Sequence, residues 1–246
     1  MSALLAQVRA ETWMTLRRGE TLLLTIGIPV VFLVFFSTVH VVDTHTLDRV
    51  TFVLPGILAL AVMSTAMVSL GIATGFERGY GVLKRLGSTP LGRPRLLGAK
   101  VSTVLLVELA QAAVLIPVGV GLGWRPPGAA GGASAAGQAL GLVLLATVAF
   151  GGIGLFLAGV LRAEVNLAAA NALYLVFLLV GGMIVPLASL PAGLAALARR
   201  LPPAALAEGL HAVMGRGLDA PLWCWVVLAV WAVAASVAAG LTFRWE

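Results

Sequence analysis

Long apolar runs alternate with short polar segments along the whole chain. Six of these runs reach the roughly 20 residues that a helix needs to cross the hydrocarbon core of a bilayer. They lie at 22–42, 52–75, 101–123, 138–161, 167–187 and 222–243. The pattern predicts an all-α integral membrane protein with six transmembrane helices, folded as a single transmembrane domain over residues 1–246.

The composition supports this prediction and excludes several other classes of protein. Hydrophobic residues make up 60% of the chain, charged residues make up 11%, and the mean hydropathy is +1.04. A water-soluble protein would not have a core large enough for so much apolar surface. The one cysteine, Cys224, lies in an apolar run, so no disulfide can form within the chain. The basic residues behind the net charge of +6 cluster at the ends of the runs, and nucleic acid is therefore not an expected partner.

The segment 76–100 is the longest strongly charged stretch. It holds six of the sixteen Lys and Arg residues and a single acid, Glu77. Because Lys and Arg near the ends of spans favour the cytoplasmic side, we expect this loop and both chain termini in the cytosol. In that orientation, eleven of the sixteen basic residues face the cytosol.

A short amphipathic helix is predicted within this loop, over residues 81–88. Val82, Leu83 and Leu86 recur at one-turn spacing, and the basic residues between them point elsewhere. Thr89-Pro90 ends the helix, because proline disfavours helical geometry in the residue before it. A loop that only met acidic lipid headgroups would need its charges alone. The ordered pattern indicates a more specific role.

Residues 1–20 predict a second amphipathic helix, lying in the cytoplasmic interface of the membrane. Leu4, Val8 and Leu16 share one face of this helix, and Trp13 is expected near the lipid headgroups. A charged tail without fixed structure is the alternative.

The segment 188–221 predicts an outer lid between the fifth and sixth spans. Each half has an apolar stripe on a piece of about a dozen residues, which is too short to cross the membrane, and Pro202-Pro203 separates the halves. A pair of short re-entrant or interfacial helices fits this pattern, with an ordinary structured loop as the alternative. We expect the polar side chains of the lid on its water-exposed side. The lid residues singled out are Pro186, Arg199, Arg200, Glu208 and His211.

The charged loop resembles that of a known family. Its motif is Glu77-Arg78-x-x-Gly81-Val82-Leu83-Lys84-Arg85-Leu86, then Thr89-Pro90-Leu91 and Gly98-x-Lys100. This motif resembles the cytoplasmic loop of the type-2 ABC exporter permeases, most closely in the daunorubicin and multidrug-resistance branch. Val82 and Lys84 depart from the family, which commonly has Thr and often Glu at those places. The length and the layout of the runs agree with the family over essentially the whole chain.

The resemblance implies that this loop is the coupling element that docks on an ATPase subunit. Leu83 and Leu86 would then fill a groove of the ATPase, with charged residues around the rim. The coupling residues implied in this way are Glu77, Arg78, Gly81, Leu83, Lys84, Arg85, Leu86, Thr89 and Pro90. The family also has an outer lid between its fifth and sixth spans.

Polar residues inside the spans are candidates for function, because each is costly in hydrocarbon. Glu108 is the only formal charge well inside a span, and Gln111 lies one turn further along the same face. Two interpretations stay open for this pair: a polar spot on a transport path, or a clasp between helices or subunits. In the resembling family the second and fifth spans line the pore, which adds further path candidates. They are Met63, Met67, Thr74, Asn171 and Tyr174.

Sequence motifs for catalysis are absent. The chain has no phosphate-binding loop of the type G-x-x-x-x-G-K-[ST], so we expect it to be no enzyme by itself. The three histidines are not at metal-ligand spacing, and the sequence suggests no nucleophile with its base. We therefore expect no metal and no cofactor on this chain, and expect ATP and magnesium on a partner ATPase.

Together with these patterns, the resemblance implies the permease subunit of an ATP-driven exporter, a multi-pass protein of the plasma membrane and, more narrowly, of a bacterial inner membrane. The expected cargo is a drug, an antibiotic or another amphiphile. The expected partners are two copies of a separate ABC ATPase, a second copy of this permease or a related permease, and membrane lipids. The alternatives are a lipid or glycan exporter of the same superfamily, a secondary transporter that uses Glu108, and a scaffold without transport. No inverted repeat between 22–123 and 138–243 supports the secondary transporter.

Overall fold

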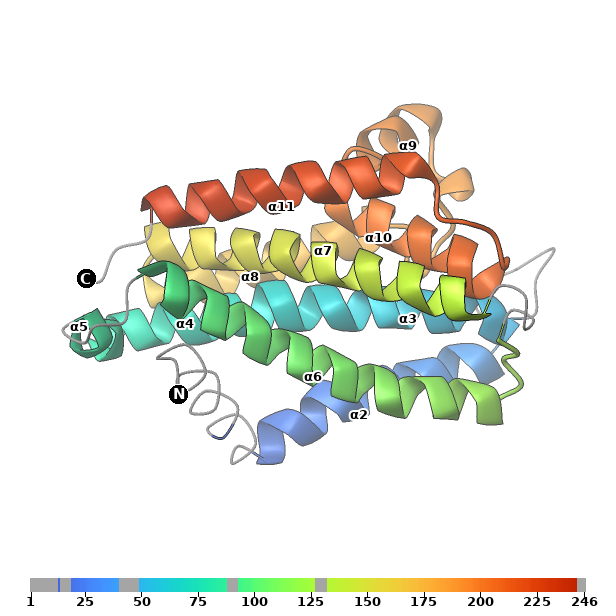
Figure 1. The fold of residues 1–246 in the computed structure, drawn as a ribbon, viewed down its shortest axis with the longest axis horizontal. Coiled ribbons are helices and arrows are strands. Elements are labelled where there is room, and N and C mark those ends of the chain that lie inside the picture. Colours follow the sequence, from blue (N-terminus) through green and yellow to red (C-terminus); the bar gives the residue numbers. More distant parts are fainter. Residues whose placement is uncertain (1–12, 14–18, 40–48, 88–92, 127–131, 243–246) are drawn as a thin grey trace.

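The computed structural model describes residues 13, 19–39, 49–87, 93–126 and 132–242. In these ranges the regular elements are all helices (Figure 1). The helices of the main bundle are α2 (Gly19–Thr38), α3 (Arg49–Met63), α4 (Leu70–Gly79), α6 (Arg93–Gly121), α7 (Gly132–Val160), α8 (Ala163–Val180) and α11 (Leu222–Thr242). The shorter elements are η1 (Ser64–Ser69), α5 (Val82–Gly87), η2 (Leu187–Ser189), α9 (Ala192–Ala198), α10 (Pro202–Leu210) and η3 (His211–Gly215).

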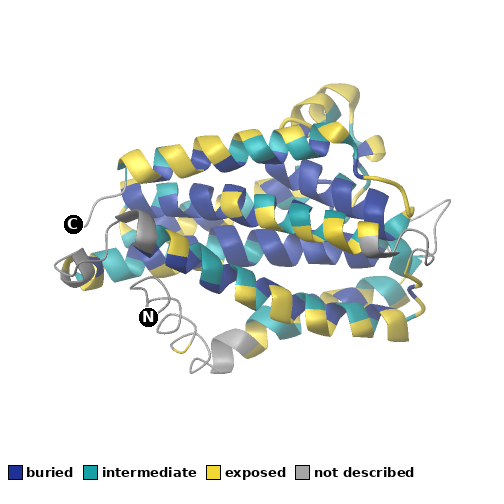
Figure 2. Ribbon diagram, viewed as in Figure 1, coloured by how far each residue is buried: buried dark blue, intermediate teal, exposed yellow. Residues whose placement is uncertain are grey.

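One continuous helix forms the centre of the bundle. The elements α3, η1 and α4 run without a break from Arg49 to Gly79, over 31 residues. The α3 part of it is apolar all round rather than along one stripe, and a helix of that kind is stable only when neighbours cover every side. Accordingly, α3 is buried along most of its length, whereas α11 is exposed along one side (Figure 2). Exposed apolar residues lie on both α8 and α11.

Helix α7 crosses this central helix in backbone contact. A Cβ atom added at Gly154 of α7 would lie 2.4 Å from the carbonyl oxygen of Met67, and one added at Gly71 would lie 3.0 Å from the carbonyl oxygen of Gly154. Such close approach needs small residues, as is common between helices in lipid. On its other side α7 packs along α11, where a Cβ at Gly152 would lie 2.8 Å from the Cβ of Ala235. Helix α7 therefore joins the centre of the bundle to its last helix.

The helical membrane-protein class predicted from the sequence is confirmed, while the number of spans is not. Five helices among the described residues are long and apolar enough to cross a membrane. They are Arg49–Gly79, Leu96–Gly121, Ser134–Val160, Ala163–Val180 and Leu222–Thr242. Helix α2 adds a shorter apolar stretch, Leu23–Thr38, and the end of the predicted first span falls outside the described residues.

The predicted end of the fifth span, at residue 187, is wrong. Helix α8 ends at Val180, because the chain turns at Gly181-Gly182 and Gly182 has a φ of 70°. That left-handed conformation suits glycine and stops a helix. At the other end of the chain, the interfacial helix predicted for residues 1–20 lies outside the described residues, except for the exposed Trp13 and the start of α2.

Candidate functional site

The amphipathic helix predicted in the charged loop is present as α5. It follows α4 after a sharp turn in which Gly81 has a φ of 70°, so a residue without a side chain is favoured at that place. Helix α5 is therefore one residue shorter at its start than predicted. It ends at Gly87, and the predicted stop at Thr89-Pro90 lies outside the described residues.

Two charged residues of the motif hold this loop to the bundle. Lys100 of α6 is buried and donates a hydrogen bond of 2.6 Å to the carboxylate of Glu77. The guanidinium of Arg78 donates to the carbonyl oxygens of Gly159 and Leu161, at the end of α7. These carbonyls have no partner within the helix, so the arginine caps α7. Glu77 and Arg78 thus tie α4 to α6 and α7, and their predicted place at the rim of an interface stays a prediction.

The exposed side chains of this end differ from those that the motif suggested. Leu83 is 0% exposed, so as the chain is folded it has no surface to offer a groove of another protein. Instead, Tyr80 is 77% exposed and stacks on Phe76 with ring centroids 6.0 Å apart, and Val82 and Lys84 are exposed beside it. Arg85 and Leu86 belong to α5, but their side chains lie outside the described part of the structure.

Glu108 lies in the middle of α6 and is 3% exposed. The hydroxyl of Thr147 on α7 donates a hydrogen bond to its Oε2 atom. Its other oxygen, Oε1, is buried and has no hydrogen-bond partner among the described residues. The contact with Thr147 supports the interpretation of Glu108 as a clasp between helices, and the second oxygen leaves it one unused acceptor.

Both the oxygen and the nitrogen of the Gln111 side-chain amide form hydrogen bonds. Its Nε2 donates to the carbonyl oxygen of Thr25 on α2 at 2.8 Å, and its Oε1 accepts from the hydroxyl of Thr65 in η1 at 3.3 Å. The side chain is buried, so these bonds offset the cost of placing an amide among apolar side chains. Gln111 is therefore a clasp between three helical elements.

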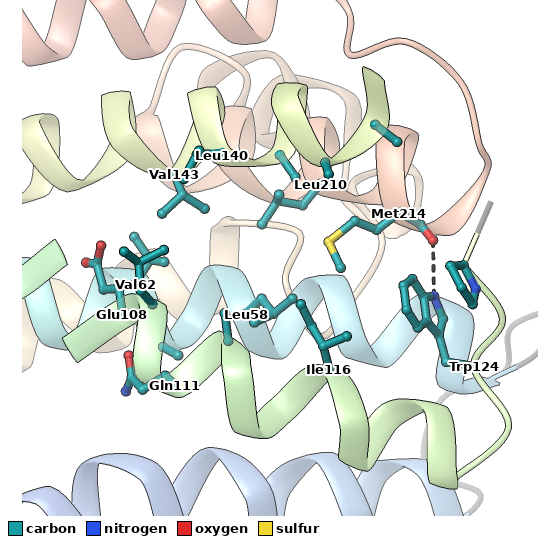
Figure 3. Close-up of a pocket in the computed structure, with 17 residues that line it drawn as sticks. Leu58, Val62, Glu108, Gln111, Ile116, Trp124, Leu140, Val143, Leu210 and Met214 are labelled. Atoms are coloured by element: carbon teal, nitrogen blue, oxygen red, sulfur yellow. Dashed lines mark hydrogen bonds between the residues drawn. The ribbon is translucent and has the colours of Figure 1, made fainter. Parts of the chain in front are cut away.

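Both residues also line a cavity of about 290 Å³. Its walls come from α3, α6, the segment that follows α6, α7 and the segment α10–η3, and they are apolar in nearly all their area. In Figure 3, Glu108 and Gln111 lie at one end of the cavity, and Trp124 and Met214 lie at the other. The indole N–H of Trp124 donates to the carbonyl oxygen of Met214 at 3.1 Å and fixes that end. This is an elongated apolar site with one carboxyl group at its inner end.

The remaining candidates for a transport path do not converge on this cavity. Met63 and Met67 are fully buried in the core, and Thr74 is buried with a hydroxyl that bonds to none of the described residues. Asn171 is exposed on α8 and donates to the carbonyl oxygen of Leu167 in its own helix at 2.8 Å, while Tyr174 is half-buried. The methionine stripe thus packs the core, and the two residues of α8 lie apart from Glu108.

Two polar residues that sequence analysis passed over matter to the packing. Thr147, the partner of Glu108, stands in mid-span, and the rule that singled out Glu108 would have found it. Asn166 falls just before the fifth predicted span, 167–187, but it lies in the first turn of α8, where its amide donates to the carbonyl oxygen of Gly71 at 2.8 Å. Only the fold shows this pairing, because the two residues are 95 positions apart.

The predicted lid contains the end of η2, then α9 and the pair α10–η3, and Pro202-Pro203 separates α9 from the rest of α10. Helix α10 begins at these prolines, which a first helical turn tolerates. Pro186 precedes η2. Arg199 and Arg200 are exposed, and the indole N–H of Trp231 donates to the carbonyl oxygen of Arg200 at 2.9 Å. Glu208 forms an ion pair with Arg216.

The expectation that His211 faces water is wrong. The side chain is 6% exposed and its ring stacks on Phe52, with centroids 4.4 Å apart. Its Nδ1 lies 2.7 Å from the carbonyl oxygen of Ala207, and its Nε2 lies 2.9 Å from that of Phe52. Burial lowers the pKa of His211 and outweighs the opposing effect of these carbonyls. The ring is inside because it follows α10 into the core and fills a place between α10 and α3.

This architecture is that of a multi-pass, α-helical membrane protein with a charged connector at one end. The sequence model of the ABC-2 type transporter family matches residues 2–214, and the chain belongs to this family. It is accordingly the permease subunit of an ABC-type exporter, and permeases of this family generally work with a separate ATPase subunit. No curated protein is similar enough to the chain to count as a match.

Proposed function

We propose that this permease exports a drug, an antibiotic or another amphiphile across a bacterial inner membrane, driven by ATP. The resemblance of the loop motif to that of the daunorubicin and multidrug-resistance branch supports this choice of cargo. Two copies of a separate ABC ATPase bind the ATP and magnesium, and this chain binds no cofactor or metal and catalyses nothing by itself. A second copy of the permease, or a related one, completes the transport path.

The observation that carries this proposal is the structure of the α4–α5 connector, by which we mean the end of α4, the turn at Tyr80-Gly81 and α5. Tyr80, Val82 and Lys84 are exposed at its tip, while Glu77 and Arg78 fasten its base to α6 and α7. A push on α5 from an ATPase would therefore reach the central helix and both of its neighbours at once. A loop that served only to set the topology would not need this attachment.

The test is a reconstitution of the purified chain with and without its ATPase. The permease alone should hydrolyse no ATP, and the complex in liposomes should hydrolyse ATP faster when an amphiphile is added. Transport of the amphiphile should require ATP. Robust ATP hydrolysis by the isolated chain would contradict the assignment, as would transport by the permease without an ATPase.

A secondary transporter is the second candidate, because Glu108 has a buried oxygen without a partner and buried acids carry protons in such proteins. Export driven by a proton gradient in the absence of ATP would favour it. A lipid or glycan exporter of the same family would behave like the proposed exporter in the ATP assay. It would differ in being stimulated by lipid or glycan rather than by small amphiphiles.

A further inference from the structure

The cavity between α6 and α7 is closed on one side by the core and bordered on the other by exposed residues. Leu109 of α6 and Leu140 of α7, both lining residues, are 43% and 45% exposed. The cavity therefore borders the lipid-facing surface between these two helices. Its volume of about 290 Å³ is at the small end of the range for ligand pockets.

The polar groups at the inner end of the cavity are not equivalent. Gln111 uses its amide oxygen and its amide nitrogen in bonds to Thr65 and Thr25. Glu108 has one oxygen bonded by Thr147 and one, Oε1, that is buried without a partner. Glu108 therefore keeps one acceptor that none of the described residues uses.

Among the described residues that line the cavity there is no Lys, Arg or His, so none of these side chains can neutralise a carboxylate. An ionised carboxyl group in apolar surroundings is very costly unless a cation accompanies it. We propose that this cavity binds the protonated amine of a single-chain amphiphile, with the ammonium on Glu108 and the apolar chain along α6 and α7 toward Trp124.

The shape of the site supports this class of ligand. Thirteen helical positions separate Glu108 from the end of α6 at Gly121, which corresponds to about 20 Å. An extended chain fits such a length. A phospholipid with an amine fits poorly, since its phosphate would lie beside the amine and so beside the carboxylate. The proposal rests on the proposed function only for what happens to the ligand after it has bound.

The experiment uses the purified full chain in nanodiscs without any ATPase. Binding of dodecylammonium and of the matched neutral 1-dodecanol is measured by titration in native mass spectrometry. Because hydrogen bonds to charged groups are stronger than neutral ones, we expect the amine to bind about tenfold more tightly than the alcohol. In Glu108→Gln the two ligands should bind equally.

Two further variants make the outcome decisive. Glu164→Gln removes an exposed acid at the start of α8 and should keep the preference for the amine. Ala139→Phe fills the cavity but leaves Glu108 and Thr147 in place, so it should abolish saturable binding of both ligands even if Glu108→Gln fails to fold. Equal binding of amine and alcohol to the unmodified chain would overturn the proposal, and so would unchanged binding by Ala139→Phe.

The result of this binding experiment can be told apart from the result of the reconstitution with the ATPase. Selective amine binding without ATP-driven transport would support the proposed amine site and contradict the proposed exporter function. ATP-driven transport without selective amine binding would support the proposed exporter function and contradict the proposed amine site.

Discussion

The surroundings of His211 determine whether its imidazole ring is protonated. Both ring nitrogens lie close to carbonyl oxygens, of Ala207 and of Phe52, yet a neutral imidazole has a single N–H and can donate to one of them at a time. Protonation would satisfy both carbonyls. The buried position opposes it more strongly and lowers the pKa of the ring below its ordinary value of 6.5. At neutral pH the folded protein therefore holds an uncharged ring stacked on Phe52.

This lowered pKa predicts how stability depends on pH. As the pH falls below 6.5, the unfolded chain binds a proton on His211 before the folded chain does, so the folded state loses stability. The loss is up to about 1 kcal/mol for a fall of one pH unit. Thermal unfolding in detergent at a pH of about 7.5 and about 5.5 measures it. His211→Gln should reduce the drop in Tm, and a double variant of His40 and His45 to Gln should keep it. An equal drop in all three proteins would refute the assignment.

At the scale of elements, α5 was predictable and its contacts were not. One-turn spacing shows which residues share a face of a helix, and it correctly placed Val82, Leu83 and Leu86 in a helix. It does not show what covers that face. The structure buries Leu83 within the chain itself and leaves Tyr80, which precedes the helix, exposed. The same limit applies to Glu108: its cost in a span is visible in the sequence, whereas Thr147 lies 39 positions away.

The exposed residues at the tip of the connector, Tyr80 and Val82, lead to a prediction at the scale of elements. Buried aromatic and aliphatic anchors dominate the energy of most interfaces. The double variant Tyr80→Ala with Val82→Ala should therefore fold normally but lose most of the amphiphile-stimulated ATP hydrolysis in the complex. Leu83→Ala should instead lower the stability of the permease by about 2–5 kcal/mol, as a core truncation does.

The two readouts are the Tm of the purified permease and the ATP hydrolysis of the reconstituted complex. If the double variant couples normally, the exposed pair is not the docking surface. If Leu83→Ala keeps its Tm and loses coupling, Leu83 turns outward in the complex, and the docking role first expected for it is restored.

The whole molecule has an axis along its long helices. Helix α5 lies at one end of the bundle, and α9 and the start of α11 lie at the other (Figure 1). The apolar runs of the sequence were enough to predict a bundle with this axis. They could not show that α3 and α4 form one helix with α7 in contact at Gly154. Backbone contacts of that kind depend on which helices meet.

The sense of this axis in the membrane is the last prediction. The basic loop of residues 76–100 should lie in the cytosol, because Lys and Arg near span ends are retained there, and α9 should then face outward. Lys84→Cys and Arg199→Cys test this, since both positions are exposed. Each is made in a Cys224→Ser background, which removes the one native cysteine, itself buried.

A membrane-impermeant maleimide is then applied to cells that express the permease without its ATPase. Arg199→Cys should be labelled in intact cells, and Lys84→Cys only after permeabilisation. The Cys224→Ser parent should stay unlabelled in both conditions. The reverse pattern would place α5 outside the cell, where no ATPase could dock, and the coupling role of the connector would have to be abandoned. Labelling of both positions from the same side would show that the bundle does not cross the membrane along its axis.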